Sequence, residues 1–338
     1  MVDKRYNIDS EISAISSEIV SWYNKKNCEI LNILSVPLTT SLIFKDLLVQ
    51  MIRDKKSIVY LWGENNKNKL LLDEIKKSKE VYPNNYISGS LRKERIDFFN
   101  YNEYINVNKE YDLIIIDDIS SFSKITPSGV KKAFKYLKNF SKKIIIYSVE
   151  EIYNKGEKIE FIISNIKNPY VEPRVINTRI DLTKDIPYIL YEYIVWFIEN
   201  KKKIIIYVPD EEKVNLTYEY YTNKLKMKKI NIVPLLKNNN KRLLRDVLVK
   251  NDRATIIITN NLEVNLTGSN IGNAVILFAD DDKYTYKNLL FICAEIGSIN
   301  KELPEVLLVS KDSSDNMDKV RDMTRYYNKI KWEHYREH

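Results

Sequence analysis

Glycine is scarce in this sequence, with 7 residues among 338. A soluble protein of average composition and this length would contain roughly 24, because glycine makes up about 7% of residues. Glycine is the residue that most readily adopts positive φ and lets a backbone approach a ligand closely. A function that depends on several glycine-rich loops is therefore disfavoured.

Histidine and cysteine are almost absent as well. The two histidines, His334 and His338, stand at the end of the chain, so its body offers no histidine for a catalytic triad or a general base. Cys28 and Cys293 are far apart, and neither belongs to a C-x-x-C pair. In the reducing context that we expect, this spacing does not predict a zinc site. Many enzyme classes are excluded in this way.

Long hydrophobic runs are missing too. No stretch of about 18 uncharged apolar residues could span a bilayer, and Met1–Ser10 lacks the basic and apolar regions of a secretion signal. We therefore expect a cytoplasmic protein without a membrane span. The composition, 44% hydrophobic and 30% charged, is that of a soluble globular chain. The length fits two domains, or at most three.

Basic residues exceed acidic ones, with 54 Lys and Arg against 46 Asp and Glu and a net charge of +8. Such an excess suits a polyanionic partner such as nucleic acid. The sequence is also strongly biased to Lys, Ile, Asn and Tyr, and the base composition of a genome can produce such a bias. The charge alone leaves both explanations open.

The hydrophobic pattern divides the chain into two series of alternating strands and helices. Residues 9–23 carry apolar side chains at helical spacing, and an extended piece follows at 29–36. The first series continues with helix 42–53, strand 57–62, helix 69–78, a weak strand near 86–88, a helix or strand near 97–105, strand 113–116, helix 128–140 and strand 143–148. This alternation indicates a mainly parallel sheet with helices on both faces.

Between residues 150 and 184 the pattern loses regularity, and Pro169 and Pro173 break any helix. A second series follows: helix 188–199, strand 204–208, helix 211–225, strand 230–235, helix 241–250, strands 255–259 and 274–278, helix 286–296, strand 306–310 and helix 316–329. The expected fold class is α/β, with two doubly wound parallel-sheet domains in tandem. We assign an N-terminal helical extension to 1–37, the first domain to 38–166, a linker to 167–184 and the second domain to 185–338.

A partial phosphate-binding loop follows the predicted strand 57–62. Gly63 and Lys69 match the pattern G-x-x-x-x-G-K-[ST]. Asn68 replaces the second glycine, and Leu70 replaces the hydroxyl residue. Such a loop turns backbone N–H groups toward a nucleotide phosphate at a helix N-terminus. Asn tolerates positive φ, whereas Leu cannot supply the hydroxyl that binds Mg²⁺. We expect these four residues to be the remains of a nucleotide-binding loop.

Two aspartates, Asp117 and Asp118, end the predicted strand 113–116. In P-loop NTPases an aspartate at this place holds Mg²⁺, and acidic or polar groups nearby position the attacking nucleophile. We therefore expect Asp117 to be the metal residue and Asp118 the catalytic residue. The alternative is that both side chains cap the loop after the strand, a common role for Asp. Asp118 is also one methylene shorter than the glutamate usual at this place, which would impair the positioning of water.

Taken together, these segments resemble superfamily 2 helicases, and within them the ComFA-like DNA-uptake ATPases of competence systems. The similarity begins at about residue 30 and follows an ordered set of segments: Leu38 to Thr40, Tyr111 to Asp118, Tyr147 to Val149, Asn168 to Val175, Ile204 to Pro209, Thr255 to Val264 and Lys319 to Asn328. The resemblance implies two RecA-like domains of P-loop NTPase type that bind ATP with Mg²⁺. It also implies a DNA strand held across both domains.

Departures from the family pattern point to weak catalysis. The family's arginine-rich motif would fall on residues 291–298, where Glu295 and Ser298 replace the arginines that stabilise a transferring phosphoryl group. The family's N-terminal zinc-binding cysteines are absent as well. Binding of ATP and Mg²⁺ is therefore doubtful. We expect a degenerate helicase-like protein with little or no ATP hydrolysis, which binds single-stranded or duplex DNA and can also have a protein partner.

Other functions stay open at this point. An active ATP-dependent DNA translocase would use Lys69 and Asp117, and a partner's arginine could act in trans. An AAA+ initiator or loader is suggested by residues 60–63 and by the short spacing between the two motifs. A scaffold that binds no nucleic acid is the third alternative.

Three basic clusters are candidates for contacts with nucleic-acid phosphates. They are Arg92, Lys93 and Arg95; Lys201 to Lys203; and Lys241, Arg242 and Arg245. Three tyrosines, Tyr218, Tyr220 and Tyr221, could stack on bases or lie in the core. The segment 188–198 could lie on a membrane surface or cover the second sheet. The sequence favours the second alternative for this segment.

Overall fold

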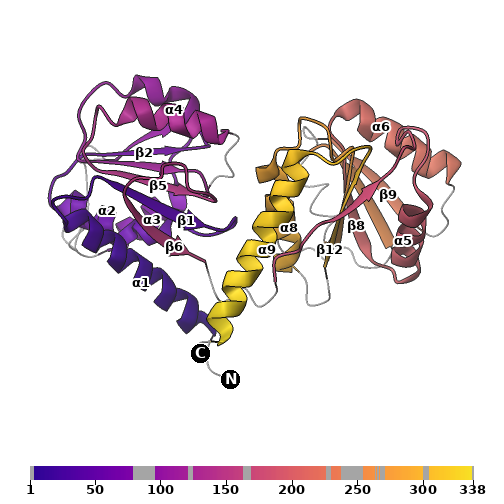
Figure 1. Cartoon of the computed structure of the whole chain (residues 1–338), viewed down its shortest axis with the longest axis horizontal. Helices are drawn as coiled ribbons and strands as arrows, with labels where there is room; N and C mark the ends of the chain where they lie inside the picture. The colour runs from indigo at the N-terminus through magenta and orange to yellow at the C-terminus, as the bar shows by residue number, and fades with distance from the viewer. Residues whose placement is uncertain are drawn as a thin grey trace. The chain divides into compact units, whose positions relative to one another are not determined.

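The computed structural model describes residues 4–78, 96–120, 125–162, 169–225, 230–236, 254–262, 264, 266, 271–299 and 304–336. The chain divides into two compact units, Met1–Asn165 and Ile166–His338 (Figure 1). Each unit contains its own parallel sheet. Among the helices that the structure describes, none is long and apolar enough to cross a membrane.

The sheet of the first unit has six described strands. They are β1 (Ile30–Ser35), β2 (Ile58–Trp62), β3 (Ile96–Asn100), β4 (Leu113–Asp117), β5 (Ile144–Ser148) and β6 (Glu157–Phe161). The spatial order is β3-β2-β4-β5-β1-β6, and all neighbours are parallel. β2, β4 and β5 are buried along their whole length. Continuous apolar strands of this kind require cover on both faces of the sheet.

Helices provide this cover (Figure 1). They are α1 (Lys4–Asn24), a 3₁₀ turn (Ser41–Phe44), α2 (Lys45–Arg53), α3 (Lys69–Lys76), a second 3₁₀ turn (Tyr101–Asn106) and α4 (Pro127–Leu137). One core contains Trp22 of α1, Leu47 of α2 and Leu71 of α3. The core on the opposite face contains Phe134 of α4 and Tyr101. The first unit is therefore a doubly wound α/β domain, as predicted.

The position of β1 differs from our assignment of residues 1–37 to an extension. β1 lies inside the sheet, with Ile30 opposite Ile144 of β5 and Leu31 opposite Glu157 of β6. Ile19 and Trp22 of α1 belong to the core of the same unit. The local pattern revealed an extended piece, but it could not show that two much later strands pair on either side of it.

The second unit also has a parallel sheet with six described strands. They are β7 (Arg174–Asn177), β8 (Lys203–Tyr207), β9 (Ile230–Leu235), β10 (Ala254–Thr259), β11 (Ile271–Leu277) and β12 (Glu305–Ser310), in the order β7-β12-β11-β8-β10-β9. The described helices are α5 (Tyr188–Glu199), α6 (Glu211–Glu219) with a π-helical turn (Tyr220–Lys224), α8 (Tyr286–Ile299) and α9 (Asp315–Arg336). The predicted tandem of two α/β domains is confirmed.

Two details of the second unit differ from expectation. The predicted linker, 167–184, contributes strand β7, which pairs with β12 and places Arg174 opposite Leu307. A parallel sheet stands where an AAA+ initiator or loader would carry a helical lid, so this alternative is not supported. The predicted strand at 86–88 and the predicted helix at 241–250 lie outside the described residues.

Candidate nucleotide site and its surroundings

Ligands of open α/β sheets bind at the carboxyl edge, between neighbouring strands whose connections leave in opposite directions. The first sheet offers two such places. The chain leaves β2 toward β3 and leaves the adjacent β4 toward β5. It likewise leaves β1 toward β2 and leaves the adjacent β5 toward β6. The predicted phosphate loop and Asp117 lie at the first place, and the loop after β1 lies at the second.

The predicted phosphate loop is closed by the side chain of Asn68. Asn68 caps α3: its Oδ1 accepts a hydrogen bond from Leu71 N–H at 3.1 Å, and its Nδ2 donates to Ser41 Oγ at 3.0 Å. Its φ of −67° is not in the left-handed region that a glycine would allow. The amide thus takes an N–H group that a phosphate would need at this helix end.

The two residues after Asn68 point to the same conclusion. Lys69 is exposed, and it makes no hydrogen bond or ion pair with any residue in the described ranges. Leu70, which stands at the place of the hydroxyl residue, is 58% exposed. An exposed leucine side chain offers no ligand to a cation. Among the side chains of Asn68, Lys69 and Leu70, that of Lys69 is the one that could contact a phosphate.

Asp117 is enclosed by the protein. Its carboxyl is fully buried and accepts hydrogen bonds from the N–H groups of Ile119 at 3.0 Å and Ser120 at 2.8 Å, and from the hydroxyl of Tyr60. Burial raises the pKa of this carboxyl above its ordinary value, while the hydrogen bonds oppose the shift. Asp118 is also buried, and its N–H donates to the carbonyl of Tyr147 at 2.8 Å.

An aromatic cluster surrounds the Asp117 carboxyl. Tyr60 and Tyr147 are both fully buried, and the ring of Phe44 packs edge-on against each of them, at centroid distances of 6.2 and 5.4 Å. Trp62 packs against Tyr60 from the same strand. Burial raises the pKa of the Tyr60 hydroxyl well above its ordinary value, so it stays protonated and donates to the aspartate. Water has no access to the carboxyl.

The loop after β1 was missed as a candidate phosphate loop. It connects an interior strand to a helix, and Leu38 adopts a φ of +70°, which is unusual for a leucine. Thr39 Oγ1 lies 2.7 Å from both Ser35 Oγ and the hydroxyl of Tyr147, and it donates to the carbonyl of Val36 at 2.9 Å. The segment contains neither glycine nor lysine, so only its strand-loop-helix order could have marked it.

Neither loop fits ATP with Mg²⁺. At the first place the Asn68 side chain occupies the helix end, and Asp117, the predicted metal residue, is buried and accepts hydrogen bonds from the protein. At the second place the hydroxyls of Ser35, Thr39 and Tyr147 bond to one another or to backbone carbonyls. The described residues also contain no group of three or more His, Cys, Asp or Glu side chains that could hold a metal ion. The carboxyl edge of the first sheet is filled by the chain's own polar groups.

The residues aligned with arginine fingers lie on α8 of the second unit. Glu295 is 5% exposed, and its Oε1 accepts a hydrogen bond from Leu266 N–H at 2.9 Å. Burial raises the pKa of Glu295 to about 7. Ser298 Oγ donates to the carbonyl of Glu295 at 2.7 Å. The Glu295 carboxyl is therefore held inside its own unit.

The predicted nucleic-acid contacts divide into described and undescribed residues. Two clusters, Arg92, Lys93 and Arg95 and Lys241, Arg242 and Arg245, lie outside the described residues. In the third cluster, Lys203 is 3% exposed, and Lys202 Nζ lies 4.8 Å from the centre of the Trp196 ring. The three lysines at 201–203 therefore do not form one exposed patch.

The tyrosines predicted to stack on bases are largely structural. Tyr221 is fully buried in the core of the second unit. Tyr220 is 7% exposed and donates a hydrogen bond to Asp185 Oδ1 at 2.6 Å. Of the three, Tyr218 alone remains half-buried. α5, in turn, covers the second sheet through Leu190, Ile194 and Phe197, as the sequence favoured.

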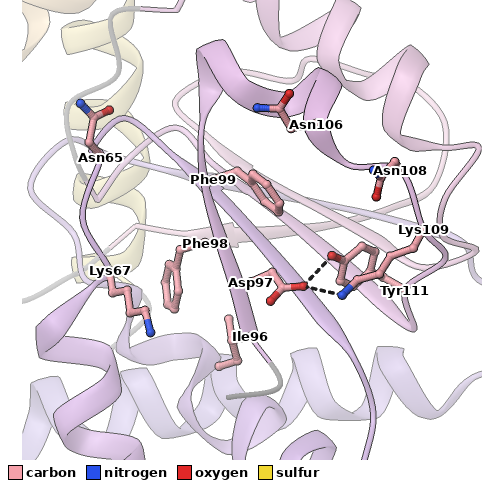
Figure 2. Close-up of a pocket in the computed structure, with 10 residues that line it drawn as sticks. All are labelled: Asn65, Lys67, Ile96, Asp97, Phe98, Phe99, Asn106, Asn108, Lys109 and Tyr111. Atoms are coloured by element: carbon pink, nitrogen blue, oxygen red, sulfur yellow. Dashed lines mark hydrogen bonds and ion pairs between the residues drawn. The ribbon is translucent and has the colours of Figure 1, made fainter. Parts of the chain in front are cut away.

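A pocket of about 740 Å³ opens along β3, at the outer edge of the first sheet (Figure 2). It is lined by Asn65, Lys67, Ile96, Asp97, Phe98, Phe99, Asn106, Asn108, Lys109 and Tyr111. Asp97 accepts hydrogen bonds from the hydroxyl of Tyr111 at 2.6 Å and forms an ion pair with Lys109 at 2.9 Å. Burial and Asp97 raise the pKa of Tyr111 to about 12. No sequence pattern predicts this pocket, because its lining comes from three separate segments.

No protein-family model matches the sequence. No curated protein matches it either. Two crystal structures of HrpB from E. coli, described as a DExH-box NTPase and as a DEAH/RHA helicase, are similar at 10% identity and a TM-score of 0.52 each. They cover 93% and 91% of this chain, but only 42% and 43% of HrpB.

A third similar structure is that of S. cerevisiae Dbp5 bound to RNA and ADP BeF3. It has 11% identity and a TM-score of 0.46, and the similarity covers 95% of this chain and 91% of that one. At such identities a likeness concerns the fold alone, and the score for Dbp5 is too low to support an inference. The chain spans less than half the length of HrpB. The HrpB structures, together with the two parallel sheets, show that this protein has a fold of two tandem RecA-like domains.

Proposed function

We propose that this protein is a helicase-like nucleic-acid-binding protein with little or no ATP hydrolysis. The observation that carries the proposal is the burial of Asp117, whose carboxyl is 0% exposed and hydrogen-bonded to Tyr60, Ile119 and Ser120. A catalytic Mg²⁺ needs a carboxylate that can face the metal and its waters. Freeing Asp117 would require the loss of three hydrogen bonds in a buried site.

The excess of positive charge supports the proposed binding of nucleic acid. The chain carries a net charge of +8, and tandem RecA-like domains offer an extended surface for a nucleic-acid backbone. From the resemblance to ComFA-like proteins we propose DNA, single-stranded or duplex, as the partner and DNA uptake or another DNA transaction as the setting. Arg92, Lys93 and Arg95 remain the proposed contacts in the first unit.

ATP turnover tests the proposal directly. Purified full-length protein with Mg²⁺, ATP and single-stranded DNA should hydrolyse no more ATP than a Lys69→Ala variant. Titration calorimetry with ATP and Mg²⁺ should give the same heat for both proteins, because neither loop is open to the nucleotide. DNA-stimulated turnover that disappears in Lys69→Ala would instead support the active translocase, with Lys69 on the phosphates and Asp117 on the metal.

A further inference from the structure

The pocket in the first unit lies along an edge of β3 that pairs with no other described strand. In the described part of the sheet, β3 pairs with β2 alone. Four consecutive residues of β3, Ile96 to Phe99, line the pocket. A cavity on one face of a sheet would be lined by alternate residues, because successive side chains point to opposite faces. The pocket therefore follows the backbone edge of β3.

Strand geometry places backbone donors on the outer edge of β3. The N–H of Asn100 donates to Glu103 Oε2 at 3.2 Å and so points away from β2. N–H groups alternate between the two edges of a strand, which places the N–H of Phe98 on the same outer side as that of Asn100. Edge strands of this kind present a row of donors and acceptors to another strand.

The side chains around the edge suit an extended peptide. Phe98 and Phe99 are partly exposed, and Figure 2 draws Phe98 on the side of Lys67 and Phe99 on the side of Asn106. Two apolar contacts on opposite faces match the alternating side chains of an added strand. Asn65 and Lys67 also line the pocket, and Figure 2 draws both on the same side of β3. Amide and ammonium groups there would bind polar or acidic side chains.

We propose that the β3 edge accepts an extended segment of a partner protein as a seventh strand of the first sheet. The segment would carry apolar side chains opposite Phe98 and Phe99 and an acidic residue toward Lys67. A single nucleic-acid strand fits less well, because two rings on opposite faces of a sheet cannot stack on successive bases of one strand. The inference is independent of the proposed DNA binding.

Selection from a displayed library of random heptapeptides, with the full-length protein as bait, supplies the probe. Selected peptides should show alternating apolar residues and at least one acidic residue. Binding is then measured by fluorescence anisotropy. On binding of the peptide, hydrogen exchange should slow at the amide of Phe98 and stay unchanged at that of Phe99, which faces β2. An equal effect at both amides, or none, would overturn the proposal.

Two kinds of variant sharpen the test. One peptide variant is N-methylated at the amides that would bond to β3, and a second at the alternate amides, which would face away from β3. The first variant should not bind, whereas the second should bind like the unmodified peptide. Phe98→Pro, which removes an outward N–H at an edge position that tolerates proline, should weaken binding at least tenfold, whereas Phe98→Ala keeps the N–H and should weaken it less. Lys67→Glu should weaken binding of the acidic peptides.

Equal binding by the two N-methylated peptide variants would contradict strand addition. Competition between the peptide and a single-stranded oligonucleotide for this edge would assign the pocket to nucleic acid.

Discussion

At the scale of single residues, the contact between Tyr60 and Asp117 is the main support for the proposed lack of ATP hydrolysis. A buried carboxylate is costly unless its oxygens are hydrogen-bonded. Here two backbone N–H groups satisfy Oδ1, and the Tyr60 hydroxyl satisfies Oδ2. The aspartate that would hold a metal is instead part of the folded core.

We therefore expect Tyr60→Phe to destabilise the first unit by about 1–3 kcal/mol, because the ring stays but the aspartate loses a donor in a buried site. The midpoint of urea unfolding measures this change. Tyr104→Phe is a matched control, since the Tyr104 hydroxyl has no hydrogen bond with any residue that the structure describes. A Tyr60→Phe protein as stable as the control would contradict a structural role for this pair.

A second prediction at this scale concerns Glu295. Burial raises its pKa to about 7 in the folded protein, whereas an unfolded glutamate titrates near 4.5. The folded state therefore keeps its proton to higher pH, and the free energy of unfolding should fall as pH rises from about 4.5 to about 7. The loss attributable to this group is about 3 kcal/mol, from about 1.4 kcal/mol per unit.

Urea unfolding at pH 5 and pH 8 checks this expectation. Glu295→Gln should reduce the difference between the two pH values, because the amide carries no charge at either and its oxygen can still accept from Leu266 N–H. If the free energy of unfolding depended on pH in the same way in the wild type and the variant, ionisation of Glu295 would not destabilise the folded protein, and the prediction would be wrong.

At the scale of elements, sequence patterns predict where most strands lie along the chain but not which strands pair in the sheet. β2, β4 and β5 were predicted because each is a continuous apolar run. The sequence patterns place β1 in an extension and β7 in a linker. Both strands are short, and they are recognised as strands only by their pairing with segments that are distant in the sequence. Propensity and periodicity are local, whereas pairing is not.

The candidate site was predictable to a similar extent. The strand-end position of Asp117 was predicted, but its burial was not, because that depends on Tyr60, which comes from another strand. The interpretation of Gly63 to Lys69 as a phosphate loop relied on two matching residues. In the structure, the loop after β1 that contains Thr39 also lies at the carboxyl edge of the sheet, between strands whose connections leave in opposite directions, and is a second candidate for a phosphate loop. The pocket along β3 has no sequence signature, since it forms only when β3 reaches the edge of the sheet.

At the scale of the whole molecule, the net charge of +8 makes a prediction about salt. Binding of single-stranded DNA should weaken at least tenfold between about 50 and about 200 mM salt, because each phosphate contact releases counterions. Substitution of Arg92, Lys93 and Arg95 by Ala should flatten this dependence. Lys184→Ala is the control, since Lys184 already pairs with Asp181 at 2.8 Å. Affinity that does not change with salt would count against a nucleic-acid surface.

The place of β1 has a consequence for how the protein is made. Among the described strands of the first sheet, β1 is synthesised before the other five, yet its two neighbours, β5 and β6, are synthesised after the other four. On a nascent chain β1 cannot pair with both neighbours until residues beyond Glu157 have emerged from the ribosome, and its apolar side chains lack this cover until then. Pairing between such distant segments is slow and leaves time for aggregation. Helix α1 is synthesised just before β1, and its Ile19 and Trp22 share a core with Leu31 of β1, so this helix can shield the strand in the meantime.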